Sequence, residues 1–272
     1  MPPYKELILF LFFMAITSST IWTQTKQQQV LFAYSDFIPK SVAGYDFLVV
    51  EPYFFSKEDV TVLKNGNKKV YAYISVGEID RGSWFYKDLK NYSIGKNPTW
   101  NSDIITVANT ETAEALHRLI NIYISEKGFE GIFLDNVDNY TVYGPTPSHT
   151  ESLVAFLTEV KRIHPNLELM QNAGVEIIDK TAHLVDVLAI ESIATDYNFR
   201  TNTYRLRDSE VYINRANEVD AVRAAYQIPI IAIEYADTQK LKEEVLKRLR
   251  PWPWSYFIGQ IDLQGTPQFS DN

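Results

Sequence analysis

Residues 187–191 read Val-Leu-Ala-Ile-Glu (VLAIE), a short apolar run that ends directly in a carboxylate. Near-continuous hydrophobicity over so short a stretch is typical of a strand buried on both faces of a parallel sheet. The same unit recurs at residues 230–234, which read Ile-Ile-Ala-Ile-Glu (IIAIE). Runs of this kind alternate with amphipathic segments, which predicts repeated strand–helix units around a parallel sheet.

Eight such apolar runs follow one another from residue 30 onward. They are Val30–Tyr34, Phe47–Val50, Val70–Val76, Gly131–Leu134, Leu167–Gln171, Val187–Ile190, Ile230–Ile233 and Tyr256–Gln260. An N-cap pair, Ser56 with Asp59, and apolar stripes at helical spacing predict the intervening helices. These helices are expected near residues 57–64, 115–124, 153–160 and 241–249.

Eight strands with helical crossovers predict an α/β fold, a single (β/α)8 TIM barrel that occupies residues 26–272. Only ten residues follow Asp262, so we expect the last helix of the outer ring to be incomplete. Two insertions are predicted, an aromatic-rich one at residues 79–110 and another at residues 194–215. The sequence shows no internal repeat and no second domain.

The N-terminus has the pattern of a secretory signal. Lys5 precedes an apolar run at residues 7–16, and small polar residues follow at 17–20. A charged start, a short apolar run and small residues predict a signal peptide over residues 1–25 and therefore a secreted, periplasmic or cell-envelope protein. The run is short for a membrane span, so we expect no span after cleavage; an uncleaved anchor is the alternative.

Composition and motifs exclude several function classes. The formal charge of −8 argues against a nucleic-acid partner, which usually needs a basic face. There is no cysteine, and the four histidines form no zinc-binding pattern, so no metal or cofactor is expected. The chain also lacks the motifs of serine hydrolases, dinucleotide-binding proteins and P-loop NTPases. We expect a monomer.

The residues at the strand ends carry the functional prediction. In chain order they are Asp36, Glu51, Glu78, Asp135, Asn172, Glu191, Glu234 and Asp262. The carboxyl ends of barrel strands meet on one face, where barrel enzymes build their active sites. Capping of the following helices is the structural alternative, and it would explain one or two of these acids.

Clustered carboxylates repel one another, so some of them should have raised pKa values. An acid kept protonated beside one kept ionised is what glycoside hydrolysis requires. Calcium or magnesium would also accept such ligands, but the sequence has no calcium-loop motif.

Aromatic residues in the strands and rim loops also favour a sugar substrate, because flat rings stack on pyranose faces. Those expected to contact the substrate are Tyr73, Trp84, Trp100, Tyr140 and Tyr197. Tyr34 and Tyr235 lie in similar positions, and ordinary packing is the alternative for Tyr34 and Tyr73.

Three motifs carry a resemblance to a known family: VYAYISVGEID at 70–80, GKNPTW at 95–100 and GFEGIFLDNVDNY at 128–140. Together they resemble the glycoside hydrolase family 114-like barrel proteins, which are related to endo-α-1,4-polygalactosaminidases. The group is also similar to the hydrolase domain of a bacterial exopolysaccharide-processing protein, and the likeness covers roughly residues 30–260. Two positions depart from the family pattern: Glu130 stands where Asp is common, and Asp80 where a second Glu is common.

The resemblance implies a retaining endo-glycosidase that acts on α-1,4-linked galactosamine polymers. It implies Asp135 as the nucleophile and Glu191 as the general acid/base, after the fourth and sixth strands. Glu78, Asp138, Asp36 and Asn172 would line the donor subsite, and Glu51, Glu234 and Asp262 would be further substrate contacts. Two alternatives remain open: a non-catalytic glycan-binding barrel, and a glycosidase for a different envelope or host polysaccharide.

Overall fold

Eight parallel strands form the central sheet of the protein, which a computed structural model describes over residues 27–271. The strands are β1 (Val30–Ala33), β2 (Phe47–Val50), β3 (Val70–Ser75), β7 (Gly131–Asp135), β8 (Glu168–Asn172), β9 (Val187–Glu191), β12 (Ile230–Tyr235) and β13 (Ser255–Gly259). They are hydrogen-bonded in this order, and a parallel bridge between Gln29 and Tyr256 joins the first strand to the last. The predicted (β/α)8 barrel is confirmed, and all eight predicted runs are its strands.

The barrel interior is filled with side chains. The rings of Phe133 and Phe257 both pack edge-on against Phe32, with centroids 5.3 and 5.4 Å away. Nearly every strand residue is buried, because one face of each strand points into the barrel and the other lies under the helices.

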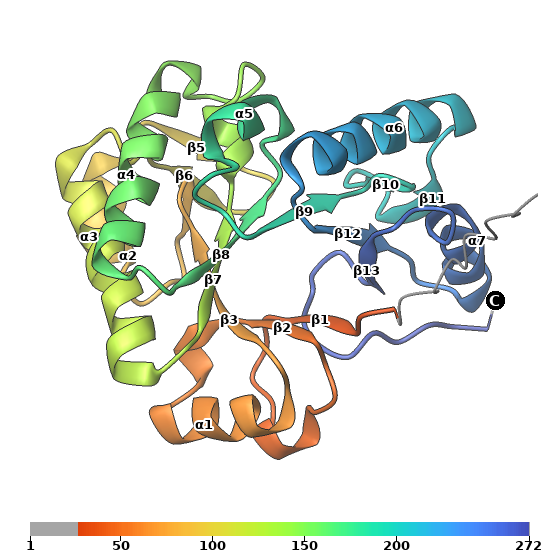
Figure 1. Ribbon diagram of the computed structural model, residues 1–272, viewed down its shortest axis with the longest axis horizontal. Helices are drawn as coiled ribbons and strands as arrows, with labels where there is room; N and C mark the ends of the chain where they lie inside the picture. Colours follow the sequence, from red (N-terminus) through yellow and green to blue (C-terminus); the bar gives the residue numbers. More distant parts are fainter. Residues whose placement is uncertain (1–26, 272) are drawn as a thin grey trace, which may run out of the picture.

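The helices surround the strands (Figure 1). They are α1 (Lys57–Gly66), α2 (Tyr86–Leu89), α3 (Thr110–Asn121), α4 (Thr150–Ile163), α5 (Ile178–Thr181), α6 (Ser209–Tyr226) and α7 (Gln239–Leu249), and α3 continues into a π-helical turn, η4 (Ile122–Lys127). Ser56 and Asp59 form the predicted capping box at the start of α1. The four predicted helices are found as α1, α3, α4 and α7.

Short 3-10 helices lie in the connections: η1 (Pro39–Ser41), η2 (Pro52–Phe54), η3 (Lys90–Tyr92), η5 (Val137–Tyr140), η6 (Pro147–His149) and η7 (Val175–Ile177). The first crossover, from β1 to β2, contains η1 and no α-helix. After β13, residues 260–271 contain no helix and run back to α7, where Ser270 forms a bridge with Thr238. The incomplete outer ring is therefore confirmed.

The two insertions form small sheets beyond the carboxyl ends of the strands. The first holds β4 (Glu78–Asp80), β5 (Gly95–Asn97) and β6 (Ser102–Ile104); the second is a hairpin of β10 (Thr195–Asn198) and β11 (Thr203–Leu206). The second insertion was predicted too long, because α6 already begins at Ser209. Val211 and Ile213 on α6 are exposed beside buried Tyr212, so the apolar residues form no helical stripe.

The predicted signal peptide, residues 1–25, lies outside the described residues. Within residues 27–271 no helix is long and apolar enough to cross a membrane.

Candidate active site

Asp135, Asn172 and Glu191 end three neighbouring strands, β7, β8 and β9. The amide nitrogen Nδ2 of Asn172 donates to Oδ1 of Asp135 at 2.9 Å and to Oε1 of Glu191 at 2.7 Å. Because both oxygens contact the same nitrogen, they are separated by no more than the sum of these two distances. The structure thus brings the two predicted catalytic carboxylates together across a single amide.

Two phenols, one half-buried and one buried, complete the hydrogen bonds of these carboxylates. Tyr73 Oη donates to Oδ2 of Asp135 at 2.8 Å, and Tyr235 Oη donates to Oε2 of Glu191. Each carboxylate therefore has one oxygen bound to a phenol and the other bound to Asn172. We call these five side chains, Tyr73, Asp135, Asn172, Glu191 and Tyr235, the carboxylate network.

Strand register explains why Tyr235 joins the network and Glu234 does not. Ile233 on β12 pairs with Glu191 on β9. Tyr235 lies two residues further along and so shares the face of Ile233, whereas Glu234 between them points to the opposite face. From the sequence, Tyr235 was predicted only as a rim aromatic, because its place beside Glu191 depends on the register between β9 and β12, which a single sequence does not display.

The backbone turns sharply just after each of the three strand ends. Asn136, Ala173 and Ser192, which directly follow Asp135, Asn172 and Glu191, have φ angles of +57°, +59° and +55°. Non-glycine residues rarely adopt this left-handed conformation, which costs about 1–3 kcal/mol each and clusters at functional sites. The same strained turn thus follows all three polar side chains of the site.

The motifs that carried the family resemblance are in direct contact. Ser75 Oγ donates to Oδ1 of Asn136 at 2.6 Å, and Asn139 Nδ2 donates to the carbonyl oxygen of Gly77 at 3.0 Å. A Cβ atom at Gly77 would lie 2.6 Å from the carbonyl oxygen of Asn136, so only glycine fits. The segment after β3 therefore supports the turn that follows Asp135.

Burial and neighbouring charges raise the pKa values of several ionisable groups of the site. Burial, followed by the Asp135 charge, raises the pKa of Glu191, although Tyr235 and Asn172 partly oppose the shift. The pKa of Asp138 is raised to about 6 by desolvation and by Asp135. Burial and the same carboxylates raise the pKa of Tyr34, so this phenol stays protonated.

The other predicted acids occupy different environments. Asp36, Asp138 and Asp262 are exposed, and Glu51 is half-buried at the start of η2. Glu78 is buried against β5 and β6, where Asn97 Nδ2 donates to it at 3.0 Å and Ser102 Oγ donates to it. We infer that Glu78 holds the first insertion in place.

Glu234 and Tyr140 were predicted to contact substrate, but the structure places both inside the protein. Glu234 is fully buried and accepts from the backbone nitrogens of Ala194 and Thr195 at 2.7 and 2.8 Å. The Tyr140 hydroxyl, also fully buried, donates to the carbonyl oxygen of Val76 at 2.6 Å. Their polar atoms support rim loops, so direct substrate contact does not fit this placement.

The two insertions meet through aromatic side chains. Trp100 of the first packs edge-on against Phe199 of the second, with centroids 5.2 Å apart. Phe199 in turn contacts Tyr197, whose ring also packs against Tyr204. Trp100 and Trp84 remain 48% and 45% exposed, so both are open to a ligand.

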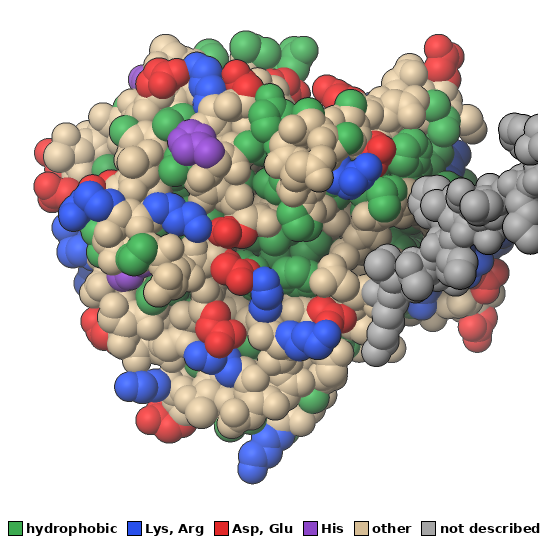
Figure 2. Space-filling model, in the orientation of Figure 1, with side chains coloured by type: hydrophobic (Ala, Val, Ile, Leu, Met, Phe, Trp, Pro, Cys, Tyr) green, Lys and Arg blue, Asp and Glu red, His purple; other side chains and the backbone are tan. Residues whose placement is uncertain are grey.

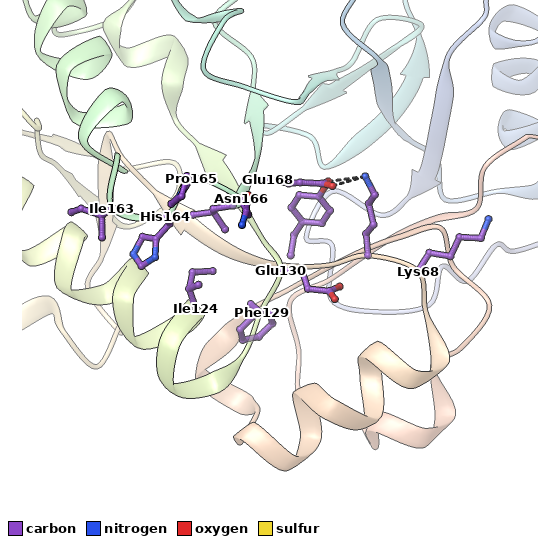
Figure 3. A pocket seen from close by; sticks show the side chains of 12 residues that line it. Lys68, Ile124, Phe129, Glu130, Ile163, His164, Pro165, Asn166 and Glu168 are labelled. Carbon is purple, nitrogen blue, oxygen red and sulfur yellow. Dashed lines mark hydrogen bonds and ion pairs between the residues drawn. The ribbon is translucent and has the colours of Figure 1, made fainter. Parts of the chain in front are cut away.

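A pocket at the opposite end of the barrel is separate from this site (Figure 3). It lies near the starts of β3, β7 and β8, where Glu168 accepts from Lys69 Nζ at 2.7 Å and from Tyr71 Oη at 2.5 Å. These polar groups satisfy one another, and in barrels that end of the strands serves stability.

Charges are mixed on the face of the protein that Figure 2 shows. Acidic and basic side chains alternate there, and hydrophobic side chains gather in a central hollow. Among residues 27–271, no group of three or more His, Asp or Glu side chains is arranged to hold a metal ion.

Comparisons with known proteins bear on this site. The model of glycoside-hydrolase family GH114 matches residues 15–265. The glycoside hydrolase domain of PelA from Pseudomonas aeruginosa is similar, with 25% identity, a TM-score of 0.77, and coverage of 89% of this chain and 99% of that domain.

Two further solved structures share the fold at lower identity. Aspergillus fumigatus Ega3, solved in complex with galactosamine, is 16% identical with a TM-score of 0.68, covering 89% of this chain and 93% of Ega3. An Anoxybacillus alpha-amylase is 13% identical with a TM-score of 0.56, covering 90% of this chain and 75% of the amylase. A search of curated proteins gave no match.

The family match spans all eight strands and the whole carboxylate network. It confirms the resemblance predicted from the three motifs and, with the PelA domain, the predicted class of enzyme. The chain is a glycoside hydrolase, and it belongs to glycoside-hydrolase family GH114.

Proposed function

We propose that this glycoside hydrolase is a retaining, endo-acting enzyme, with Asp135 as the nucleophile and Glu191 as the general acid/base. The observation that carries the proposal is the single amide of Asn172 that bridges the two carboxylates. Retaining enzymes hold their carboxyl groups about 5–5.5 Å apart, whereas inverting enzymes leave about 6.5–9.5 Å for a water molecule. Oxygens that share one hydrogen-bond donor fit the shorter separation.

Two steps follow from these roles. Asp135 attacks the anomeric carbon while Glu191 gives its proton to the departing glycosidic oxygen, which leaves a glycosyl ester on Asp135. Glu191, now ionised, then takes a proton from water, and the resulting hydroxide displaces Asp135 from the sugar. Two inversions at one carbon give net retention.

The environments of the two carboxyls suit these roles. Burial raises the pKa of Glu191, which favours the protonated form that a general acid needs. Asp135 accepts hydrogen bonds from Tyr73 and Asn172, and such donors stabilise a carboxylate.

We propose an α-1,4-linked galactosamine-type polysaccharide as the substrate. Similarity to the PelA domain and to Ega3, which was solved with galactosamine, supports this choice. The exposed rim acids Asp36, Asp138 and Asp262 would attract ammonium groups, and Trp84 and Trp100 would stack on sugar rings. The departures at Glu130 and Asp80 lie outside the carboxylate network.

We also propose that the enzyme is a monomer and that it is exported; Lys5 and the apolar run at residues 7–16 support the export. Cleavage would fall between residues 18 and 27 and leave a mature enzyme without its signal peptide.

The catalytic assignment is tested by Asp135→Asn and Glu191→Gln. The purified protein is incubated with partly deacetylated α-1,4-galactosamine polymer, its fully N-acetylated form and other polysaccharides, and new reducing ends are measured. Each variant should lose at least about a hundredfold in rate, because one step loses its nucleophile or its proton donor. The first-formed anomer, followed by proton NMR, should be α.

Glu159→Gln on the outer surface of α4 is the matched control and should keep full activity. Circular dichroism should show that all the variants fold. Hydrolysis at the wild-type rate by either Asp135→Asn or Glu191→Gln would contradict the catalytic assignment. A β-anomer as the first product would contradict a retaining mechanism. Silence of the wild type on every amino-sugar polymer would point to a different polysaccharide.

A further inference from the structure

The two oxygens of Glu191 have partners of different chemistry. Oε1 accepts from the amide nitrogen of Asn172 at 2.7 Å, and Oε2 accepts from the hydroxyl of Tyr235. An amide nitrogen can only donate, whereas a phenol oxygen can donate or accept. The two oxygens therefore differ in whether they can carry a proton within this arrangement.

Resting on the proposed role of Glu191 as general acid/base, we infer that Tyr235 is a positioning residue that fixes the transferable proton of Glu191 on Oε2. A proton on Oε1 would compete with the N–H of Asn172 for the lone pairs of that oxygen and weaken that bond. A proton on Oε2 can be donated to the hydroxyl oxygen of Tyr235, which then changes from hydrogen-bond donor to acceptor. Oε1 meanwhile keeps its bond to Asn172, and with it the geometry of the carboxylate pair.

Tyr235 then acts on the step in which Glu191 loses its proton. As the proton moves from Oε2 to the glycosidic oxygen, the O–H of Tyr235 turns back and donates to the carboxylate that is forming. A donor already in place where charge develops lowers the barrier without a cost of reorganising solvent. Burial and the charge of Glu191 raise the pKa of Tyr235, so its own proton is retained throughout.

Other groups around Glu191 raise its pKa, whereas the hydrogen bond from Tyr235 lowers it. Asp135 on β7 and Asp138 on η5 raise the pKa of Glu191 through their charges, and Tyr34 after β1 also lies within range of Glu191. Tyr235→Phe leaves these groups and the ring of residue 235 in place. It removes one donor to the carboxylate, so Glu191 should become a weaker acid.

The test compares the pH dependence of kcat/KM for the wild type and Tyr235→Phe on the polymer that the wild type hydrolyses. The alkaline limb, where the general acid loses its proton, should move up by about one pH unit or more, as expected for a lost bond to a charged group. At its optimum, kcat should fall about tenfold or more while KM changes less, because the lost donation develops mainly in the transition state.

The protein provides a matched control at the other end of the barrel. Tyr71 is also buried, and its hydroxyl donates to Oε2 of Glu168. Tyr71→Phe should lower stability by a similar amount and leave the pH profile unchanged. If Tyr235→Phe fails to fold, a fluorotyrosine at position 235 serves instead; it is a stronger donor and should move the limb downward.

A second readout does not depend on activity. The carboxyl carbons of 13C-labelled glutamate are titrated by NMR, with the Glu191 signal identified by its loss in Glu191→Gln. The pKa of Glu191 should be higher in Tyr235→Phe than in the wild type. An unchanged pKa, or an unchanged alkaline limb, would overturn the role of Tyr235. A wild type inactive on every polymer would defeat the proposed function alone, since the titration still tests the hydrogen bond.

Discussion

Glu51 is a rim carboxylate whose burial disfavours its ionised form in the folded protein. It directly follows β2 at the start of η2, accepts from the backbone nitrogen of Tyr53 at 3.2 Å and is half-buried. Burial raises its pKa from 4.5 to about 7, and the nearby Lys127 only partly compensates. The folded protein therefore binds this proton more tightly than the unfolded chain does. The contribution of protonated Glu51 to the free energy of unfolding is fully present below about pH 4.5. It is lost as the pH rises through about 7.

Glu51→Gln should make the folded protein more stable at pH 8 by about 1–3 kcal/mol, because the amide keeps an oxygen for Tyr53 and carries no charge. At pH 4 the gain should disappear. Urea unfolding at both pH values measures the difference, and exposed Asp36→Asn should change the free energy of unfolding by less than about 0.5 kcal/mol at either pH. An equal gain at pH 4 and pH 8 would show that the charge of Glu51 is not the cause.

At the scale of elements, the left-handed residues that follow β7, β8 and β9 turn the chain where the carboxylate network is held. Ala173 follows Asn172 with φ +59°, and Gly174 continues the turn with φ +69°. Ala173→Gly removes the side-chain strain but adds flexibility to the unfolded chain, so these effects should nearly cancel. Ala173→Val places a β-branched residue in this conformation and should destabilise the protein by about 1–3 kcal/mol.

The valine variant should also lose kcat, because Asn172 would shift away from one of its two carboxylates. Tm and kcat are measured for both variants. The glycine variant reports the effect of losing the methyl group, and the valine variant reports the effect of added strain. A valine variant as stable and as active as the glycine variant would mean that the turn is not strained.

The sequence predicted those elements whose burial leaves a one-dimensional pattern. The eight strands were found because their apolar runs are nearly continuous, and α1 because of its Ser56 cap. Helix α6 was missed, since exposed Val211 and Ile213 flank buried Tyr212 and blur its apolar face. The acids at the strand ends were found by position, but partners such as Tyr235 depend on register between strands, which a single sequence does not display.

For the whole molecule, no helix follows β13 within residues 260–271, and other contacts hold the end of the barrel there. β13 meets the start of β1 through the bridge between Gln29 and Tyr256. Residues 264–271 then run back to α7, where Ser270 donates its backbone N–H to Asp237 at 2.9 Å and accepts from Gln239 at 2.8 Å. The tail thus fixes the end of β13 to the preceding strand–helix unit.

Phe269 is the apolar anchor of this tail. Its ring is half-buried, lines a cavity beside β1 and β13, and lies 4.3 Å from Lys242 Nζ of α7. Phe269→Ala removes buried apolar area and should lower the free energy of unfolding by about 1–2 kcal/mol. For a domain of this size, that lowers Tm by roughly 3–6 °C. Activity at 25 °C should stay near that of the wild type, because the tail anchor is not part of the carboxylate network. Gln264→Ala, an exposed residue at the start of the tail, should leave Tm unchanged. If Phe269→Ala melts with the wild type, the tail is only an appendage, and the pairing of β1 with β13 closes the barrel unaided.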